Sequence, residues 1–185
     1  MTKKDVMDYW WRSTAPRSIV LVTSRSKDGK LNVMPMAWSM PVSQGPPLLT
    51  IAMSKRNYSH ELINETGEFV LNIPTKQIID EVNTCGSTSG RSVDKIKNTG
   101  LSISSAKTVK PPIINECIAH IECKVVDKFD AGDHTLFVGR VLAAYAEDEL
   151  FTEFGWDLTK AKPLLHVGGR LYAEPSTAIK PKNSQ

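Results

Sequence analysis

A short cluster of cationic and hydroxyl-bearing residues stands between an apolar run and a helical pattern, at residues 54–59. It contains Ser54, Lys55, Arg56 and Ser59. Hydroxyls, an ammonium, a guanidinium and the free backbone N–H groups at a helix start are groups that bind phosphate in proteins. The cluster therefore predicts a site for an anionic ligand. A solvated turn with an ordinary helix cap is the alternative that the same residues allow.

An apolar run, residues 34–40, precedes this cluster along the chain. Its large side chains alternate with small residues or proline, and Pro35 and Pro41 exclude a helix. The large members are Met34, Met36, Trp38 and Met40. Such a run is typical of a protein core, because methionine fills irregular gaps. Beside a phosphate-binding cluster, a soft surface with an aromatic edge also fits the ring system of a flat, phosphorylated cofactor.

Four further side chains could meet a ligand. Cys85 ends a predicted helix before a loop of small residues, 86–90, and a buried structural thiol is the alternative to a reactive one. Arg91 and Lys95 follow this loop, where they either reach a ligand or remain solvated. His134 lies in a polar Gly-Asp-His-Thr turn, from which its ring could donate a hydrogen bond to a ligand carbonyl, although the segment also fits a plain turn.

Several common catalytic motifs are missing from the sequence. It contains no GxGxxG, no GxxxxGK[ST], no HExxH and no GxSxG. These absences argue against a Rossmann nucleotide site, a P-loop, a zincin and a common serine hydrolase. The four histidines lie far apart and lack metal-type spacing to cysteine, so we expect no zinc site.

Strand-like runs at short spacing must position these residues. Six runs are strand-like, at residues 18–24, 31–40, 48–53, 69–73, 118–126 and 135–146, with a further short candidate at 164–167. Four segments are helical, at residues 5–13, 58–65, 75–85 and 92–98, with Thr75 and Ser92 as expected caps. An Asp-Gly turn after the first strand predicts an antiparallel hairpin, and Gly139 predicts a bulge. This order favours a mainly β fold, a closed antiparallel barrel with inserted helices, over an alternating βαβ sheet.

Composition limits the class of protein. The 185 residues are 41% hydrophobic and 23% charged, with a net charge of +3 and both signs interspersed, which predicts no nucleic-acid partner and no membrane surface. No signal peptide or membrane span is predicted, and three cysteines fit a reducing compartment, so we expect a cytoplasmic protein. We expect one domain over residues 1–185, with its core at about 15–175 and a polar tail at 179–185.

Four segments together resemble the flavin reductase-like family of FMN-binding split-barrel proteins, and within it the flavoredoxin-type members. They are PRSIVLVTSRSKDGKLNVMPMAWSMPVSQGPPLL, SKRNYSHELINETGEFVLNIP, CGSTSGRSVDKI and, above all, GDHTLFVGRV. The resemblance implies a six-stranded antiparallel split β-barrel that forms a homodimer, with one FMN per subunit near the dimer interface. It also implies an oxidoreductase that passes hydride or electrons from NAD(P)H through FMN to an acceptor. A flavoredoxin-type electron-transfer protein reduced by a protein donor and a non-redox flavin-binding module are the alternatives.

The resemblance also divides the candidate residues by role. The implied flavin floor is Met36, Ala37, Trp38, Ser39 and Met40, and the implied phosphate end is Ser54, Lys55, Arg56 and Ser59. The implied loop over the flavin contributes Cys85, Gly86, Ser87, Arg91 and Lys95. His134 matches a histidine near the nicotinamide and is the implied catalytic residue, and His166 and Tyr172 would close the site. The bulk of Met36, Trp38 and Met40 favours tightly held FMN.

Overall fold

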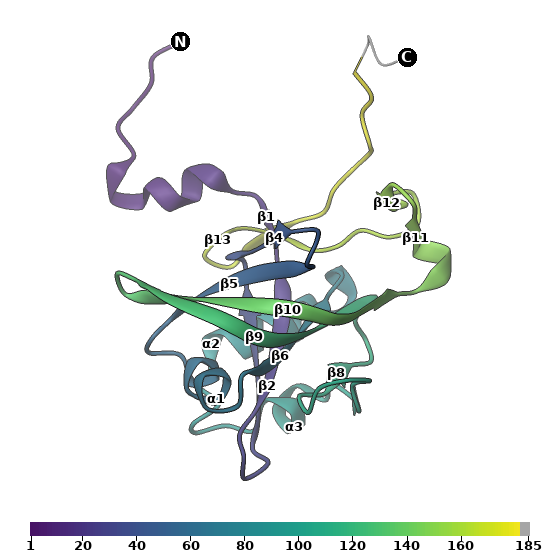
Figure 1. Ribbon diagram of the computed structural model, residues 1–185. Helices are drawn as coiled ribbons and strands as arrows, with labels where there is room; N and C mark the ends of the chain where they lie inside the picture. The colour runs from purple at the N-terminus through teal and green to yellow at the C-terminus, as the bar shows by residue number, and fades with distance from the viewer. Residues whose placement is uncertain (182–185) are drawn as a thin grey trace.

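Seven antiparallel strands form the main sheet of the computed structural model, which describes residues 1–181 (Figure 1). Their order across the sheet is β3-β2-β6-β9-β10-β5-β4. Their bounds are β2 Val20–Arg25, β3 Leu31–Met36, β4 Ser39–Ser43, β5 Leu48–Ser54, β6 Glu68–Ile73, β9 Ala119–Ala131 and β10 His134–Ala146. The expected mainly β class with antiparallel pairing is confirmed.

One predicted strand, residues 31–40, is two strands in the structure. The chain leaves β3 at Ala37 and Trp38 and continues as β4, which lies at the opposite edge of the sheet order. β3 pairs with β2, whereas β4 pairs with β5, and the backbone N–H of Ala52 donates to the carbonyl of Trp38 at 2.9 Å. Alternating side chains in a sequence do not show which neighbour a strand pairs with, so the break was not predicted.

The long β9–β10 hairpin carries the predicted bulge. Its register shifts between Val138 and Gly139. A Cβ atom on Gly139 would lie 2.8 Å from the Phe69 ring and 3.0 Å from the Cβ atom of Cys123, so a larger residue would collide with the core. Glycine is therefore required here by close packing.

Four longer helical segments and two single turns join the strands. They are η1 Met7–Thr14, α1 Tyr58–Thr66, η2 Lys76–Ile78, α2 Ile79–Ser87, α3 Lys95–Thr99 and η3 Asp148–Leu150. The predicted cap Thr75 is confirmed, since its hydroxyl accepts from the Gln77 N–H. The predicted cap Ser92 is wrong: Asp94 caps α3 by accepting from the Lys97 N–H at 3.1 Å, while the Ser92 hydroxyl donates to the Ser89 carbonyl. The predicted loop also begins later, because α2 includes Gly86 and Ser87.

Short strands complete the fold. They are β1 Arg17–Ser18, β7 Ile103–Ser104, β8 Ile113–Ile114, β11 Phe151–Thr152, β12 Gly155–Trp156, β13 Leu165–Gly168 and β14 Leu171–Ala173. β1, β13 and β14 form a separate sheet, so the predicted strand 18–24 is divided at Ile19, whose N–H donates to the Leu164 carbonyl. Strands of two residues are too short to show a hydrophobic period. Residues 182–185 of the predicted tail lie outside the described residues.

The apolar core lies on both faces of the sheet. Val20 and Val22 of β2 pack into one cluster with Met36 and Phe137, whereas Leu21 packs into a second cluster beneath α2. A strand covered on both faces has a continuous apolar sequence, as β2 does. Among residues 1–181, no helix is both long enough and apolar enough to cross a membrane.

Candidate cofactor site

A cleft of about 450 Å³ opens where the end of β3, the end of α2 and the β13–β14 hairpin meet. Five of the predicted cofactor residues line it, namely Ala37, Gly86, Ser87, His166 and Tyr172. The cleft volume falls within the range of roughly 300–1,000 Å³ that is typical of cofactor sites. Tertiary structure thus brings together residues from distant parts of the sequence.

Two features make this cleft suitable for a ligand. A Cβ atom on Gly86 would approach the Pro35 side chain to 3.0 Å, so glycine lets α2 end close against β3. The His166 ring contacts the Gly169 carbonyl through Nε2 at 3.1 Å, while its Nδ1 is buried without a partner among the described residues. Because Nε2 carries the proton that the carbonyl accepts, Nδ1 of the neutral ring is an acceptor without a partner among the described residues.

An aromatic wall lies next to the cleft. Trp38 stacks on His134 with ring centroids 4.8 Å apart and planes inclined by 28°. The guanidinium of Arg17 lies 5.9 Å from the Trp38 ring, and Arg17 pairs with His166 in the β1–β13 ladder. These contacts connect His134 with the cleft residue His166.

His134 is held by its neighbour in the sequence. Its Nδ1 lies 2.7 Å from the Asp133 carboxylate, and this hydrogen bond lowers the pKa of Asp133. A carboxylate can only accept, so Nδ1 of His134 carries a proton. Across the β10–β5 ladder His134 pairs with Ser54, which places the histidine beside the cationic cluster.

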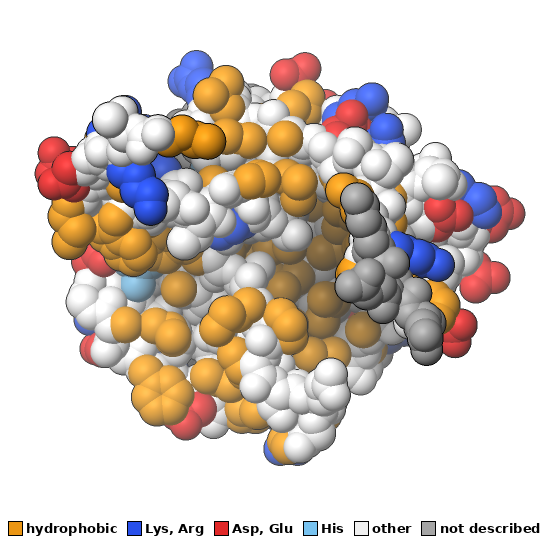
Figure 2. Space-filling view, turned by 90° about the horizontal axis from the view of Figure 1, so that it is seen from above, with side chains coloured by type: hydrophobic (Ala, Val, Ile, Leu, Met, Phe, Trp, Pro, Cys, Tyr) orange, Lys and Arg blue, Asp and Glu red, His pale blue; other side chains and the backbone are white. Residues whose placement is uncertain are grey.

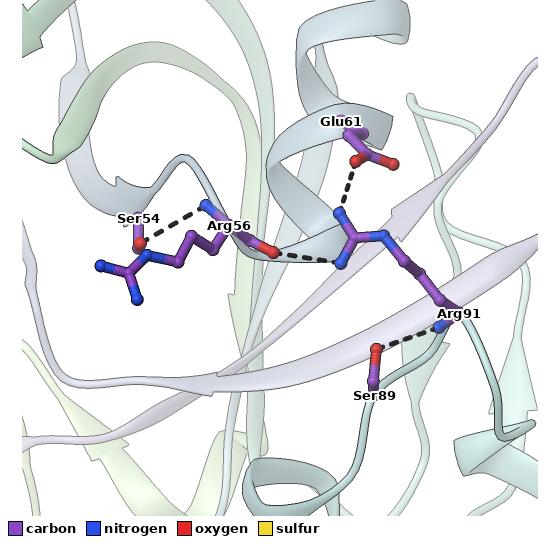
Figure 3. Close-up of polar contacts among 5 residues, drawn as sticks. All are labelled: Ser54, Arg56, Glu61, Ser89 and Arg91. Carbon is purple, nitrogen blue, oxygen red and sulfur yellow. Dashed lines mark hydrogen bonds and ion pairs between the residues drawn. The ribbon is translucent and has the colours of Figure 1, made fainter.

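Figure 3 shows the cationic cluster at the end of β5. The backbone N–H of Arg56 donates to the Ser54 hydroxyl at 3.4 Å, and the Arg56 guanidinium has no hydrogen bond or ion pair within the described residues. Arg91 donates to the Arg56 carbonyl at 3.0 Å and forms an ion pair with Glu61. Lys55 is paired with Asp130 at 3.1 Å. Arg56 is therefore the cation of this cluster that an anionic ligand can engage without breaking an ion pair.

Four predicted site residues turn their side chains into the interior, which corrects the expectation of direct side-chain contact. Met36 belongs to the core cluster, and Ser59 is fully buried, where its hydroxyl bonds to Ser24 and Asn32. Cys85 is 1% exposed, and burial raises the pKa of its thiol to about 11, so it fits the alternative of a structural thiol. The burial of Met36 agrees with core packing, which is typical of such a run, because alternating side chains along a strand do not reveal which face is covered.

Lys95 is the fourth inward side chain. It is 6% exposed, and its ammonium donates to the carbonyls of Val33 at 3.0 Å and Cys85 at 2.7 Å. Burial lowers the pKa of Lys95. The lysine thereby ties the end of α2 to β3 and holds Gly86 beside the strand, which is a positioning role. Of the remaining floor residues, Ser39 is half-buried and Met40 is 59% exposed on the edge strand β4.

Some residues of the site were missed by sequence reasoning. Asp133 stands next to His134 in the quoted Gly-Asp-His-Thr turn, so a signal was present. Arg17, Glu61 and Asn83 carry no local signal, because their contacts depend on strand pairing and helix docking. Within residues 1–181, no group of three or more histidine, cysteine or acidic side chains is arranged to hold a metal ion.

Comparison with known proteins identifies the family. The sequence model of the flavin reductase like domain matches residues 12–174, most of the chain. The chain belongs to the flavin reductase-like family. An uncharacterised protein of Archaeoglobus fulgidus is 43% identical over 113 residues, which span 61% of this chain and 64% of that protein.

Solved structures of the same fold support this assignment. A flavoredoxin from Methanosarcina acetivorans superposes with a TM-score of 0.85 at 27% identity, covering 99% of this chain and 96% of that chain. An FMN-binding protein from Thermus thermophilus with bound 1-cyclohex-2-enone superposes with a TM-score of 0.83 at 27% identity, covering 98% of each chain. The flavin reductase-like chain is therefore a single-domain FMN-binding-type split barrel, as expected.

Proposed function

We propose that this flavin reductase-like protein binds FMN in the cleft between β3, α2 and the β13–β14 hairpin and acts as an oxidoreductase. The observation that carries the proposal is the cleft itself, which gathers Ala37, Gly86, Ser87, His166 and Tyr172 from distant parts of the sequence. The FMN-binding proteins of the same fold support the choice of this cofactor.

Each side chain of the site has a defined task in this proposal. Ala37 and Trp38 provide an apolar wall for the ring, and Arg56 supplies a positive charge for the phosphate. Asp133 fixes the ring of His134, so that Nε2 can meet the carbonyl or amide of a bound substrate. When bound, FMN supplies the acceptance of hydride from a reduced nicotinamide and the onward transfer of electrons.

The proposal includes a homodimer. Two neighbouring cross-strand rows lie on one face of the sheet formed by β4, β5, β10 and β9. The first row contains Met40, Thr50 and Val138, and the second contains Ala52, Leu136 and Phe129. Met40 and Phe129 are 59% and 54% exposed. Figure 2 shows that apolar side chains gather on one face of the molecule. A concentration of exposed apolar side chains is typical of a protein–protein interface.

Absorbance spectroscopy tests the cofactor assignment. We expect the purified protein, supplied with FMN, to be yellow and to release FMN on denaturation. A protein that stays colourless and does not retain FMN would contradict the proposal.

Anaerobic mixing with NADH or NADPH then tests the direction of electron flow. Bleaching of the flavin absorbance supports an NAD(P)H-dependent oxidoreductase. A yellow protein that neither nicotinamide bleaches, but that a reduced redox protein does, is a flavoredoxin-type electron-transfer protein. A protein that no donor reduces is a non-redox flavin-binding module.

A further inference from the structure

An N-terminal arm, residues 1–14, projects from the upper side of the molecule in Figure 1. It contains η1, in which no residue is buried. The apolar side chains of Met7 and Trp10 are 70% and 55% exposed. An isolated helix shorter than about 12–15 residues is marginal in water, and 3₁₀ geometry is weaker still. An eight-residue 3₁₀ segment with exposed tryptophan therefore needs a surface to pack against.

Within the described residues, the hydrogen bonds that join the arm to the rest of the subunit lie at its base. Arg17 donates to the Trp11 carbonyl at 3.0 Å and also to the Thr14 hydroxyl. Trp10 meets Trp11 edge to face, with ring centroids 6.4 Å apart, so its nearest aromatic neighbour lies within the arm. The apolar side chains of the arm are thus presented outward on a firmly attached base.

A matching surface lies at the end of β10 that is remote from His134. This apolar hollow has a volume of about 430 Å³. Its apolar walls are Ile73, Ala119, Ile121, Ala144, Phe151 and Trp156. Phe151 and Trp156 meet edge to face at 5.0 Å between ring centroids, and Phe151 is 49% exposed. Viewed from the side that bears the arm, the molecule is hollowed and lined with apolar side chains (Figure 2).

The tip of the arm and the rim of the hollow differ in charge. The arm carries Lys3, Lys4 and Arg12 against Asp5 and Asp8, and no described residue engages Lys3 or Lys4 in an ion pair. Of the consecutive acidic residues Glu147, Asp148 and Glu149, Asp148 lines the hollow, and the Lys107 ammonium lies 3.8 Å from the centroid of the Tyr145 ring, which also lines it. Opposite charges around an apolar centre favour one partner and one orientation.

We propose that in the homodimer the arm of each subunit packs Met7 and Trp10 into the apolar hollow of a second copy, with Lys3 and Lys4 against the acidic residues 147–149. A two-fold axis then repeats the contact twice, because each chain supplies one arm and one hollow. The inference rests on the proposed homodimer and is independent of FMN binding.

Disulfide trapping tests the contact directly. Trp10→Cys and Phe151→Cys are introduced into separate full-length chains, which are mixed and oxidised. The three native cysteines are at most 3% exposed and give little background. We expect a covalent dimer from the mixture and little from either variant alone. Trp10→Cys mixed with Lys97→Cys is the control, because Lys97 lies on α3, away from the arm (Figure 1).

Sedimentation equilibrium provides the second measurement. Trp10→Ala should weaken dimerisation at least about tenfold, as truncation of a tryptophan in an interface pocket does. Asp148→Lys should also weaken it, and Lys4→Glu in the same chain should restore part of the loss. A dimer that shows no cross-link and the same dissociation constant for all variants overturns the proposal. FMN absorbance, measured in parallel, reports the cofactor assignment separately.

Discussion

Removal of the Arg56 guanidinium tests the proposed phosphate end of the site. Arg56 is exposed at the start of the turn after β5, and its guanidinium has no ion pair within the described residues. Arg56→Ala should therefore leave the fold intact, since its guanidinium makes no hydrogen bond or ion pair among the described residues and interacts with Asp133 only through its charge. Its effect should appear in ligand affinity alone.

The expected magnitude follows from the type of contact. A hydrogen bond to a charged group contributes about 1.5–3 kcal/mol. The side chain is exposed, so solvent and salt screen it, and we expect the lower end of this range. A loss of about 1.5 kcal/mol corresponds to a dissociation constant for FMN that is roughly tenfold higher.

Fluorescence titration with FMN and with riboflavin provides the assay. Riboflavin has the same ring but lacks the phosphate, so Arg56→Ala should weaken FMN binding and leave riboflavin binding unchanged. Lys55→Ala is the matched control, because Lys55 already pairs with Asp130 at 3.1 Å and is less available to a ligand. Equal losses for the two flavins, or no loss for FMN, would refute the placement of the phosphate at Arg56.

Three further predictions concern the turn, the interior and the bulge. Asp133→Asn should lower the rate of flavin reduction by NAD(P)H with little change in FMN affinity, because His134 loses its charged partner; stopped-flow absorbance measures this. Glu122→Gln should lower the free energy of unfolding by about 1–3 kcal/mol at pH 7, measured by urea denaturation, because the buried carboxylate accepts charge-assisted hydrogen bonds. Gly139→Ala should cost about 1–3 kcal/mol by overpacking, whereas Gly45→Ala, with no atom within 4 Å of its added Cβ, should be nearly neutral in thermal melts.

The pH dependence of Glu122 follows from its pKa. Burial alone raises the pKa of Glu122, but hydrogen bonds from Thr108, from the Lys107 N–H and from Tyr145 outweigh burial, so the net pKa is lower than usual. A carboxyl whose pKa is lowered by folding stabilises the protein above its unfolded pKa, about 4.5 here, and loses that contribution as the pH falls through the folded value. The difference between wild type and Glu122→Gln should therefore shrink below about pH 4.5.

Each of these predictions can fail visibly. A fall in FMN affinity as large as the fall in rate for Asp133→Asn would mean that Asp133 acts on the cofactor site as a whole. A difference between wild type and Glu122→Gln that persists at low pH would contradict the role of the ionised carboxylate. Equal melting temperatures for the Gly139 and Gly45 variants would show that the close contacts at the bulge relax without cost.

Sequence reasoning succeeded where a local pattern fixes the outcome. The Asp-Gly turn and the bulge at Gly139 each depend on a backbone conformation or a packing limit that glycine satisfies. Sequence reasoning did not decide between core and surface where the outcome depends on which strand lies alongside. Met36 fits a strand equally well on either face, and only the pairing of β3 with β2 turns it into the core.

Residue types at short spacing were enough to predict most of the sheet strands, the family resemblance and the cationic cluster before α1. Which of the candidate residues share a cleft depends on the tertiary structure. In the fold, Cys85 and Lys95 are buried, and Ala37 and His166 line the same cleft. The Arg56 guanidinium has no ion pair among the described residues. Burial and partners depend on strand order and helix docking across long sequence separations.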